Sequence, residues 1–426
     1  MQMVILMVVF FGLMILGVPI PASLGFALYQ DAIWGGGASL GFIGRTMIRS
    51  MDSFPLLAVP MFILAGEIMG RGGISKKMFD LANSMIGRMD GGLPVAAVLT
   101  SFLFGAISGS GVATFAAVGA LMIPLLVKQG YDVKFVTGLT ATAGGLGVIL
   151  PPSLPMVMFA VAANESIGDM FIAGIVPGVI AGIALMAYAY IYCKRNKIPP
   201  LPDEMKPLPL RKTFRDGFLA LLTPAIILGG IYSGFFTATE AAAVSVVYAI
   251  IISKFFYKSI RLRDLPKYLL NAAALTGPML IIISLATVFG RTLTFAGVPG
   301  MLSQAILSIS ENRIVILILV NIVLLIIGLF MDTISAIVIL TPLVLPIAQS
   351  IGMDPVHLGV IMIVNKAIGL VTPPVGLNLF VASAMTKIPI TQISKAAVGP
   401  IVALLIALLL ITAVPALSTG LVNLLR

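Results

Sequence analysis

Apolar runs long enough to cross a lipid bilayer recur along this chain, and they restrict its fold more than any other feature. Examples are residues 1–17, 170–193, 268–290 and 398–417. About twenty apolar residues in a helix cross roughly 30 Å of hydrocarbon. Hydrophobic residues make up 59% of the 426 and charged residues only 10%, whereas a soluble domain carries about 25% charged residues. The sequence therefore predicts an all-α polytopic membrane protein.

Several other classes of protein are excluded by residue counts. One cysteine, Cys193, excludes a disulfide framework, and one histidine, His357, excludes a histidine-based metal cluster. No GxxxxGK[ST] phosphate loop is present, so ATP hydrolysis by that route is not expected. The net charge of +10 comes from basic residues beside apolar spans, which indicates membrane topology rather than nucleic-acid binding.

Two basic loops orient the chain. Residues 194–215 and 254–267 are rich in Lys and Arg, and two apolar helices lie between them, so both loops face one side, predicted to be the cytoplasm. Segments 91–127 and 314–350 are interrupted by small polar residues and are predicted to be re-entrant helical hairpins, the first opening to the cytoplasm and the second to the exterior. About ten full spans are expected at 1–17, 20–35, 53–70, 135–163, 170–193, 216–236, 238–256, 268–290, 355–386 and 398–420.

The chain also contains an internal repeat. Gly147 pairs with Gly369 and Pro151-Pro152 with Pro373-Pro374, each 222 positions later, and this register holds without a gap over about 50 residues. Further upstream, Pro60-Met61 resembles Pro278-Met279. Five spans per half is an odd number, so the second copy should run through the membrane in the opposite direction. Inverted repeats with discontinuous helices are typical of secondary transporters.

The repeat divides the chain into three parts. The first repeat, 1–193, has scaffold helices in 1–90, a hairpin and broken helix in 91–165 and a closing span at 170–193. A cytoplasmic basic linker covers 194–217. The second repeat, 218–426, has scaffold helices in 218–312, a hairpin and broken helix in 313–387 and a closing span at 398–420.

Four segments are expected to carry the chemistry: the hairpin tips 105–114 and 328–335, and the proline-pair regions 144–153 and 369–378. A proline pair removes two amide donors and breaks a helix, and non-helical backbone at membrane depth survives where protein buries it or where it lines a wet cavity. Such breaks expose carbonyl oxygens suited to Na⁺ and half-helix N-termini suited to anions. Small-xxx-small helix packing at Gly105 and Gly109, and simple kinks at the prolines, are the alternatives.

Two charged residues in apolar sequence have more than one interpretation. Asp332 is either part of the site or a local cap on the second arm of its hairpin. Lys366 is either a counter-charge to Asp332 or to a substrate carboxylate, or a side chain that snorkels to the membrane surface. Glu240, in Thr237-Ala-Thr-Glu240, is predicted to form a capping box.

These segments resemble the large, DctM-like membrane subunit of the tripartite ATP-independent periplasmic (TRAP) transporters. The similarity covers nearly the whole chain and is carried by the stretches 60–66, 106–111, 147–153, 237–241 and 372–383. It implies a multi-pass permease of the bacterial inner membrane that imports small organic acids, such as C4-dicarboxylates or sialic acids, on a Na⁺ gradient. It also implies an elevator motion and two partners, a small DctQ-like membrane subunit and a periplasmic substrate-binding protein. Lys366 does not belong to the family pattern.

Two Na⁺ sites are predicted, one in each repeat. The first uses Ser108, Ser110 and Gly111 with Gly145 and Gly147, and the second uses Gly328 and Asp332 with Gly369 and Thr372. The substrate carboxylate is expected between the hairpin tips, near Ser110, Thr114, Ser153, Asp332, Thr333 and Asn378.

Three other functions are weighed against this one. A proton-coupled organic anion carrier needs a chain of titratable groups within the membrane, and the sequence offers little beyond Asp332 and Lys366. A channel also contains re-entrant hairpins, but it would not accumulate substrate. An enzyme is not expected, because no nucleophile–base pair or metal-binding cluster is visible in the sequence.

Overall fold

The protein is helical throughout the part of the chain that the structure describes. The computed structural model describes residues 2–34, 39–87, 89, 91–196, 208–309 and 312–425. The central residues of the predicted basic linker, 197–207, lie outside this part of the chain. Every regular element in the described ranges is a helix, so the predicted all-α class is confirmed.

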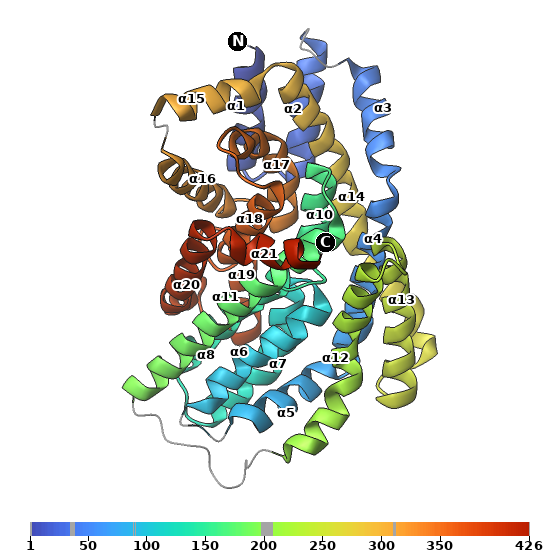
Figure 1. Cartoon of the computed structure of the whole chain (residues 1–426), viewed down its shortest axis with the longest axis vertical. Helices are drawn as coiled ribbons and strands as arrows, with labels where there is room; N and C mark the ends of the chain where they lie inside the picture. The colour runs from blue at the N-terminus through green and yellow to red at the C-terminus, as the bar shows by residue number, and fades with distance from the viewer. Residues whose placement is uncertain are drawn as a thin grey trace.

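The helices divide into two sets according to the parts that the sequence predicts (Figure 1). The first set is predicted scaffold: α1 Gln2–Ile15, α2 Ile20–Ile33, α3 Leu40–Met51, α4 Ala58–Arg71, α5 Ile74–Ile86, α12 Leu210–Tyr232, α13 Ala238–Ile251, α14 Leu265–Phe295 and α15 Val298–Ile309. The second set contains the hairpins and broken helices: α6 Gly92–Ser108, α7 Gly111–Lys128, α8 Val133–Gly144, α9 Leu146–Ile149, α10 Leu154–Ala163, α11 Ile167–Arg195, α16 Arg313–Gly328, α17 Thr333–Ser350, α18 Pro355–Gly369, α19 Leu377–Thr386, α20 Ile390–Ala413 and α21 Ala416–Leu425. The two sets pack extensively against each other, as α5 does on α6 and α14 on α17.

Both predicted hairpins are present, and local chemistry explains where each one turns. Helix α6 ends at Gly109, whose φ of +63° favours glycine, and the Ser110 side chain accepts a hydrogen bond from the amide of Ala113 to begin α7. Helix α17 begins where Asp332 accepts from the amides of Ile334 and Ser335. In Figure 1 the α6–α7 hairpin lies in the lower half of the molecule and the α16–α17 hairpin in the upper half, so the tips meet from opposite directions.

Both predicted helix breaks are present as well. The segment Val133–Ile149 and the helix Leu154–Ala163 meet at an angle of 43° across the first proline pair. Helix α18 ends at Gly369, and α19 begins at Leu377 after Gly376, whose φ is +52°. Both proline pairs are joined by cis peptide bonds. The inverted-repeat fold with two hairpins and two broken helices therefore agrees with the sequence prediction.

The lengths of the helices differ among the expected spans. Within the described ranges, eight helices are long and apolar enough to cross a membrane, or nine if the bent pair at 133–163 counts as one span. Two of the eight are the hairpin arms α7 and α17. The expected spans 1–17 and 20–35 are helices of 14 residues each, or about 21 Å at 1.5 Å per residue. The expected span 355–386 consists of the short helices α18 and α19.

The predicted closing span at 398–420 needs a correction. Its helix, α20, runs from Ile390 to Ala413, and α21 is a separate helix that starts at Ala416. The break falls at Val414, directly before Pro415, because the residue before a proline is disfavoured in the helical region. Helices α3, α5 and α15 were not expected from the sequence at all.

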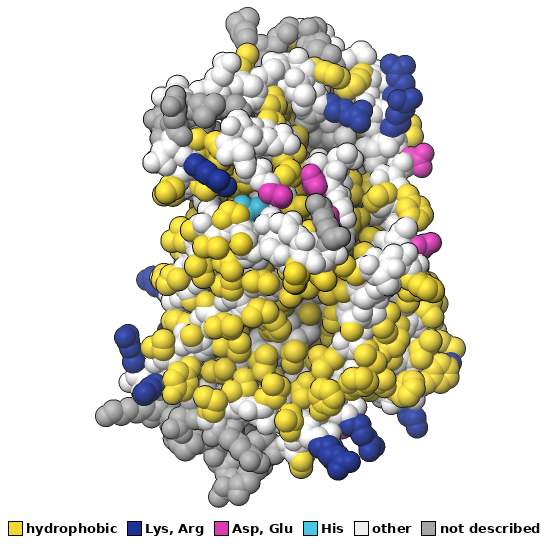
Figure 2. Space-filling view, viewed as in Figure 1, with side chains coloured by type: hydrophobic (Ala, Val, Ile, Leu, Met, Phe, Trp, Pro, Cys, Tyr) yellow, Lys and Arg dark blue, Asp and Glu magenta, His cyan; other side chains and the backbone are white. Residues whose placement is uncertain are grey.

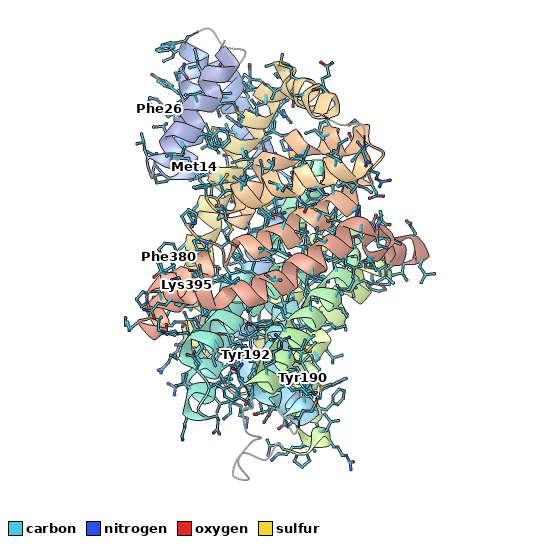
Figure 3. The ribbon with its side chains drawn as sticks, turned by 90° about the vertical axis from the view of Figure 1, so that its left-hand side faces the viewer. Met14, Phe26, Tyr190, Tyr192, Phe380 and Lys395 are labelled. Carbon is cyan, nitrogen blue, oxygen red and sulfur yellow. The ribbon has the colours of Figure 1, made fainter. Side chains whose placement is uncertain are left out.

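The surface and the packing are those of a membrane protein. Figure 2 shows a band of apolar side chains across one face of the molecule, with most of the Lys and Arg of this face below and above it. In Figure 3, α20, which carries Lys395, crosses α11, which carries Tyr190 and Tyr192, and α20 also packs against α8. The ring of Tyr192 stacks on that of Phe135, with ring centres 3.7 Å apart. The closing helices thereby hold the first broken helix in place.

Candidate functional site

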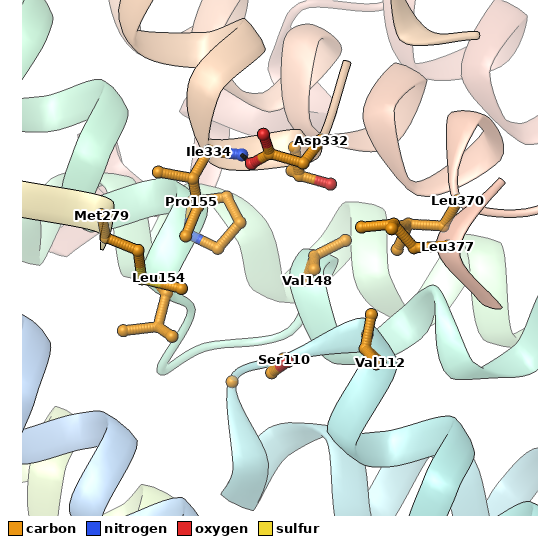
Figure 4. A pocket seen from close by; sticks show the side chains of 13 residues that line it. Ser110, Val112, Val148, Leu154, Pro155, Met279, Asp332, Ile334, Leu370 and Leu377 are labelled. Atoms are coloured by element: carbon orange, nitrogen blue, oxygen red, sulfur yellow. Dashed lines mark hydrogen bonds between the residues drawn. The ribbon is translucent and has the colours of Figure 1, made fainter. Parts of the chain in front are cut away.

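A central pocket of about 120 Å³ lies where the two hairpin tips meet (Figure 4). Ser110 and Gly111 line it from the first tip, and Asp332 and Thr333 line it from the second. The first broken helix contributes Val148, Leu154 and Pro155, the second contributes Leu370 and Leu377, and α14 contributes Met279. The sequence prediction of a site between the tips therefore corresponds to a real cavity that elements of both repeats line.

Oxygen atoms gather beside the first tip. The hydroxyl groups of Ser108 and Thr114 share a hydrogen bond of 2.6 Å, and Ser108 Oγ lies 3.3 Å from the carbonyl oxygen of Ser110. A methyl group on Gly147 would overlap Thr114 Oγ1 and lie 2.7 Å from the Ser110 oxygen. Glycine at 147 thus keeps the break in the helix pressed against the tip. Hydroxyl and carbonyl oxygens are the ligands that Na⁺ takes in discontinuous helices.

Asn378 adds one more oxygen to this side of the site. Its Nδ2 donates a hydrogen bond to the carbonyl oxygen of Ala141, 2.8 Å away, and lies 3.0 Å from where a Cβ on Gly144 would be. Its Oδ1 is buried and has no hydrogen-bond partner among the described residues. A buried amide oxygen without a donor is rare and is available to a cation. This geometry places Asn378 beside Ala141 and Gly144 of the first broken helix, although the sequence analysis assigned it to the substrate.

The second repeat's predicted cation residues surround a much smaller cavity, of about 10 Å³. Gly328, Asp332 and Gly369 line it, together with Thr333 and the side chain of Lys366. The Asp332 carboxylate accepts hydrogen bonds from two amides at the start of α17 and from the Ser335 hydroxyl. Asp332 therefore has the capping role, one of the two that the sequence left open, and it also lines both cavities.

Lys366 is buried rather than extended to the membrane surface. Its side chain is 1% exposed, and Nζ donates a hydrogen bond to the carbonyl oxygen of Leu324, 2.8 Å away. The snorkelling interpretation of this residue is therefore wrong. The reason is its position on α18, between α16 and the hairpin tip, where neighbouring helices enclose the whole side chain.

Three other predicted residues lie near the site without lining either cavity. Ser153 Oγ donates to the carbonyl oxygen of Val148, and Thr372 Oγ1 donates to that of Ile368. Gly145 packs against Ala367 of the second repeat, since a Cβ there would lie 3.1 Å from the Ala367 oxygen. The contacts of these three residues with the backbone help to fix its conformation at the two helix breaks.

A second, larger pocket of about 360 Å³ lies farther along the same interface. The same three helices line both pockets, and their lining residues follow one another at helical spacing. On α10, Leu154 lines the central pocket and Met158 and Val161 line the larger one. The corresponding residues are Met279, then Ile283 and Ala286, on α14, and Ile334, then Val338, on α17. Steps of three or four residues keep these side chains on one face of each helix. The two pockets therefore lie one after the other along a line, termed the path, between the predicted scaffold helix α14 and the helices α10 and α17.

Arginine side chains mark the outer end of this path. Arg49 of α3 and Arg291 of α14 line the larger pocket together with Ser50, Thr287 and Thr294. Helix α3, and the end of α14 that leads to α15, lie toward the end of the molecule opposite the ends of α11 and α12 that flank the linker (Figure 1). A cleft lined by positive charge raises the local concentration of anions.

Sequence reasoning missed three of these contributors, Met279, Arg49 and Arg291. Met279 belongs to the repeated Pro-Met pair, which was a signal that could have placed α14 at the site. Arg49 and Arg291 gave no such signal, because only packing of α3 against α14 brings them to one cavity. In the described ranges, no group of three or more His, Cys, Asp or Glu side chains is placed to hold a metal ion.

Comparison with known proteins agrees with this architecture. Residues 7–417 match the family model described as "Tripartite ATP-independent periplasmic transporter, DctM component". The chain is 43% identical over 380 residues to the C4-dicarboxylate TRAP transporter large permease protein DctM of Pseudomonas aeruginosa, covering 88% of each protein. It is 37% identical over 404 residues to the sialic acid TRAP transporter large permease protein SiaM of Vibrio cholerae, covering 95% of this chain and 94% of that one.

Two further similarities extend the comparison. The isethionate TRAP transporter permease protein DctMQ of Oleidesulfovibrio alaskensis is 44% identical over 409 residues, which cover 95% of this chain but only 64% of that protein. Among solved structures, the fold resembles that of the Alcanivorax borkumensis YdaH transporter, with a TM-score of 0.61, 14% identity and 88% of each chain covered. That similarity concerns the fold alone.

Proposed function

Because this chain belongs to the DctM family of tripartite ATP-independent periplasmic transporters, as a multi-pass permease of the bacterial inner membrane, we propose that it imports a small organic acid by coupling it to Na⁺. Its relatives are transport permeases rather than enzymes. The observation that carries the proposal is the central pocket, where hairpin tips from both repeats present backbone breaks to one small cavity.

The coupling ion is proposed from the oxygen atoms beside the first tip. The hydroxyl groups of Ser108 and Thr114 and the carbonyl oxygen of Ser110 form an uncharged, oxygen-rich set, and the unpartnered Oδ1 of Asn378 belongs to a side chain that bonds to the broken helix of the first repeat. The predicted glycines 111, 145 and 147 let the backbone segments approach one another there. Such a set suits Na⁺, which discontinuous helices bind through carbonyl oxygens. In the second repeat, Gly328, Asp332 and Gly369 line the smaller cavity together with Lys366, whereas the predicted Thr372 donates its hydroxyl to the Ile368 oxygen.

The substrate is proposed to occupy the central pocket between Ser110 and Thr333, which it would reach by the arginine-lined outer pocket. Among the relatives, the names give isethionate, C4-dicarboxylate and sialic acid as the transported compounds of those proteins. All three are organic anions, and the Arg49–Arg291 pocket fits that class by charge. We propose the class of substrate only.

Two partners are proposed with the permease: a small DctQ-like membrane subunit and a periplasmic binding protein that delivers the substrate. The relative named DctMQ is longer than this chain, and its name joins both subunit letters. The movement proposed is an elevator motion, in which hairpins and broken helices slide against the scaffold. The path between α14 and the pair α10 and α17 lies at the boundary where such sliding would occur.

Uptake by the complex in proteoliposomes tests the proposal. The permease, purified with its small subunit and binding protein, should accumulate the organic acid only when a Na⁺ gradient is imposed. Uptake that follows a pH gradient and ignores Na⁺ would favour the proton-coupled alternative, for which Asp332 and Lys366 are the titratable pair at the site.

Asp332 allows the charge and the helix cap to be separated. Asp332→Asn keeps an acceptor for the amides of α17, since asparagine caps as well as aspartate, but removes the negative charge. Asp332→Ala removes both. If the carboxylate takes part in binding or coupling, both variants should lose uptake, and only the alanine variant should be less stable. Normal uptake by Asp332→Asn would show that Asp332 acts only as the N-cap of α17.

A further inference from the structure

The two repeats differ at one position beside the helix break. Lys366 corresponds to Gly144, since 366 − 144 and 373 − 151 are both 222 and the register contains no gap between them. In one repeat this position has no side chain, and in the other it carries a buried ammonium group. This difference lies within the two stretches of about 50 residues in which the repeats match without a gap.

In the first repeat, glycine at positions 144 and 111 lets the hairpin tip approach the helix break closely. A Cβ on Gly144 would lie 3.0 Å from the carbonyl oxygen of Gly111, and a Cβ on Gly111 would lie 3.4 Å from the carbonyl oxygen of Gly144. The nearest side chains to these two positions are those of Leu370, Phe115 and Asn378, none of which is charged. A positive charge at this contact would therefore have to come from a bound ion.

In the second repeat, the lysine occupies the corresponding place. Its Nζ lies 3.2 Å from the position of a Cβ on Gly328, and a Cβ on Gly369 would lie 2.9 Å from the Gly328 carbonyl oxygen. The ammonium group thus faces the same contact between hairpin tip and broken helix. The Leu324 oxygen accepts its hydrogen bond, and the Asp332 carboxylate lines the cavity beside it.

The remaining space is too small for an additional hydrated ion. The cavity of about 10 Å³ is close to the volume that holds one water molecule, and an ion there would also meet the positive charge of Lys366. A charged side chain at membrane depth is costly and is usually retained for function.

We propose that the ammonium group of Lys366 is the resident cation of the second repeat, held in the place where a second Na⁺ would otherwise bind. The inference rests on the proposed Na⁺-coupled function and makes it more specific: Na⁺ is required at the first repeat, and the second repeat carries its own tethered positive charge.

Replacing the lysine with methionine tests this inference. Lys366→Met keeps most of the length of the side chain and removes both the charge and the hydrogen bond to the Leu324 oxygen, so the Tm of the variant without Na⁺ is measured first to show that it folds. In proteoliposomes containing the complete complex, the half-saturating Na⁺ concentration should rise at least tenfold, or the number of Na⁺ ions transported per substrate should increase by one. Lys134→Met, an exposed lysine at the start of α8, is the matched control and should behave as the unmodified protein.

A binding measurement decides the matter if Lys366→Met does not transport. Na⁺ should raise the Tm of the purified unmodified complex as bound ligands do, and the dependence of Tm on Na⁺ concentration should become steeper in the variant because a second ion binds. An unchanged Na⁺ dependence in both transport and Tm would overturn the inference. Uptake by the unmodified protein that ignores Na⁺ would instead refute the proposed function itself, so the two failures are distinguishable.

Discussion

The side-chain amide of Asn378 donates a hydrogen bond to the carbonyl oxygen of Ala141, 2.8 Å away, and so joins the broken helices of the two repeats. Ala141 lies near the end of α8, where the amide of Gly145 bonds to the Thr142 oxygen instead. The last carbonyl groups of a helix lack partners within it. Asn378 therefore completes the end of a helix from the opposite repeat.

Removing this amide should weaken both folding and ion binding. We expect Asn378→Ala to lower the free energy of unfolding by about 1–3 kcal/mol, the cost of a buried acceptor left without its donor. If Oδ1 also binds Na⁺, the half-saturating Na⁺ concentration for uptake should rise about tenfold, which corresponds to about 1.4 kcal/mol. Thermal unfolding in detergent and Na⁺-dependent uptake measure the two effects. Lower stability with unchanged Na⁺ dependence would limit Asn378 to the structural role.

Gly147→Ala should damage the first cation site. The added methyl group would overlap Thr114 Oγ1 and lie 2.7 Å from the Ser110 oxygen, so the tip must move away from the break. Such overpacking costs about 1–3 kcal/mol, and uptake should need at least tenfold more Na⁺. Gly277→Ala is the control, because nothing lies within 4 Å of its added methyl group. Equal Na⁺ dependence in both variants would argue against a cation at this tip.

The arginine-lined outer pocket predicts a dependence on charge and salt. Replacing Arg49 and Arg291 together with glutamine should raise the apparent KM for the anion up to roughly tenfold, with little change in maximal rate, because steering affects the approach of the substrate. Added salt should reduce the difference in apparent KM between this double variant and the unmodified protein, because salt screens the charges. Arg45→Gln on the same helix does not line the pocket and should leave KM unchanged. A loss of maximal rate without a change in KM would contradict this role.

The scaffold offers a test of stability that does not involve the site. Thr237 and Glu240 form the predicted capping box at the start of α13, where the Thr237 hydroxyl accepts from the Glu240 amide and the Glu240 carboxylate accepts from the Thr237 amide. Thr237→Ala should cost about 1 kcal/mol of stability, whereas Thr237→Ser should cost little. Thermal unfolding of the two variants checks this, and the Na⁺ dependence of uptake should match the unmodified protein in both.

The elements that sequence predicted well are those that local chemistry determines. The hairpin tips and breaks fall at prolines, glycines and capping residues such as Ser110 and Asp332, whose effects extend over a few neighbouring residues. The capping box at Thr237 was confirmed for the same reason. Duplication of these features within the chain made each prediction firmer, because chance does not repeat a pattern in one register.

The remaining features depend on which helices pack together, and no local pattern determines that. Burial of Lys366 follows from α16 and the second hairpin enclosing α18. Arg49 and Arg291 share a pocket only because α3 packs against α14. Likewise, α20 ends at Ala413 because Pro415 follows closely, but the apolar sequence continues past this point and so predicted a longer span.

The way α14 spans both pockets has a consequence for selectivity. Met279 faces the central pocket, whereas Ala286 and Gly290, two and three turns later, face the outer one. Small residues of the predicted scaffold helix therefore line the pocket through which we propose that the substrate enters. A bulky side chain at Ala286 would exclude large acids while smaller ones still pass, so relatives could exchange one substrate for another without altering the groups that bind the ion.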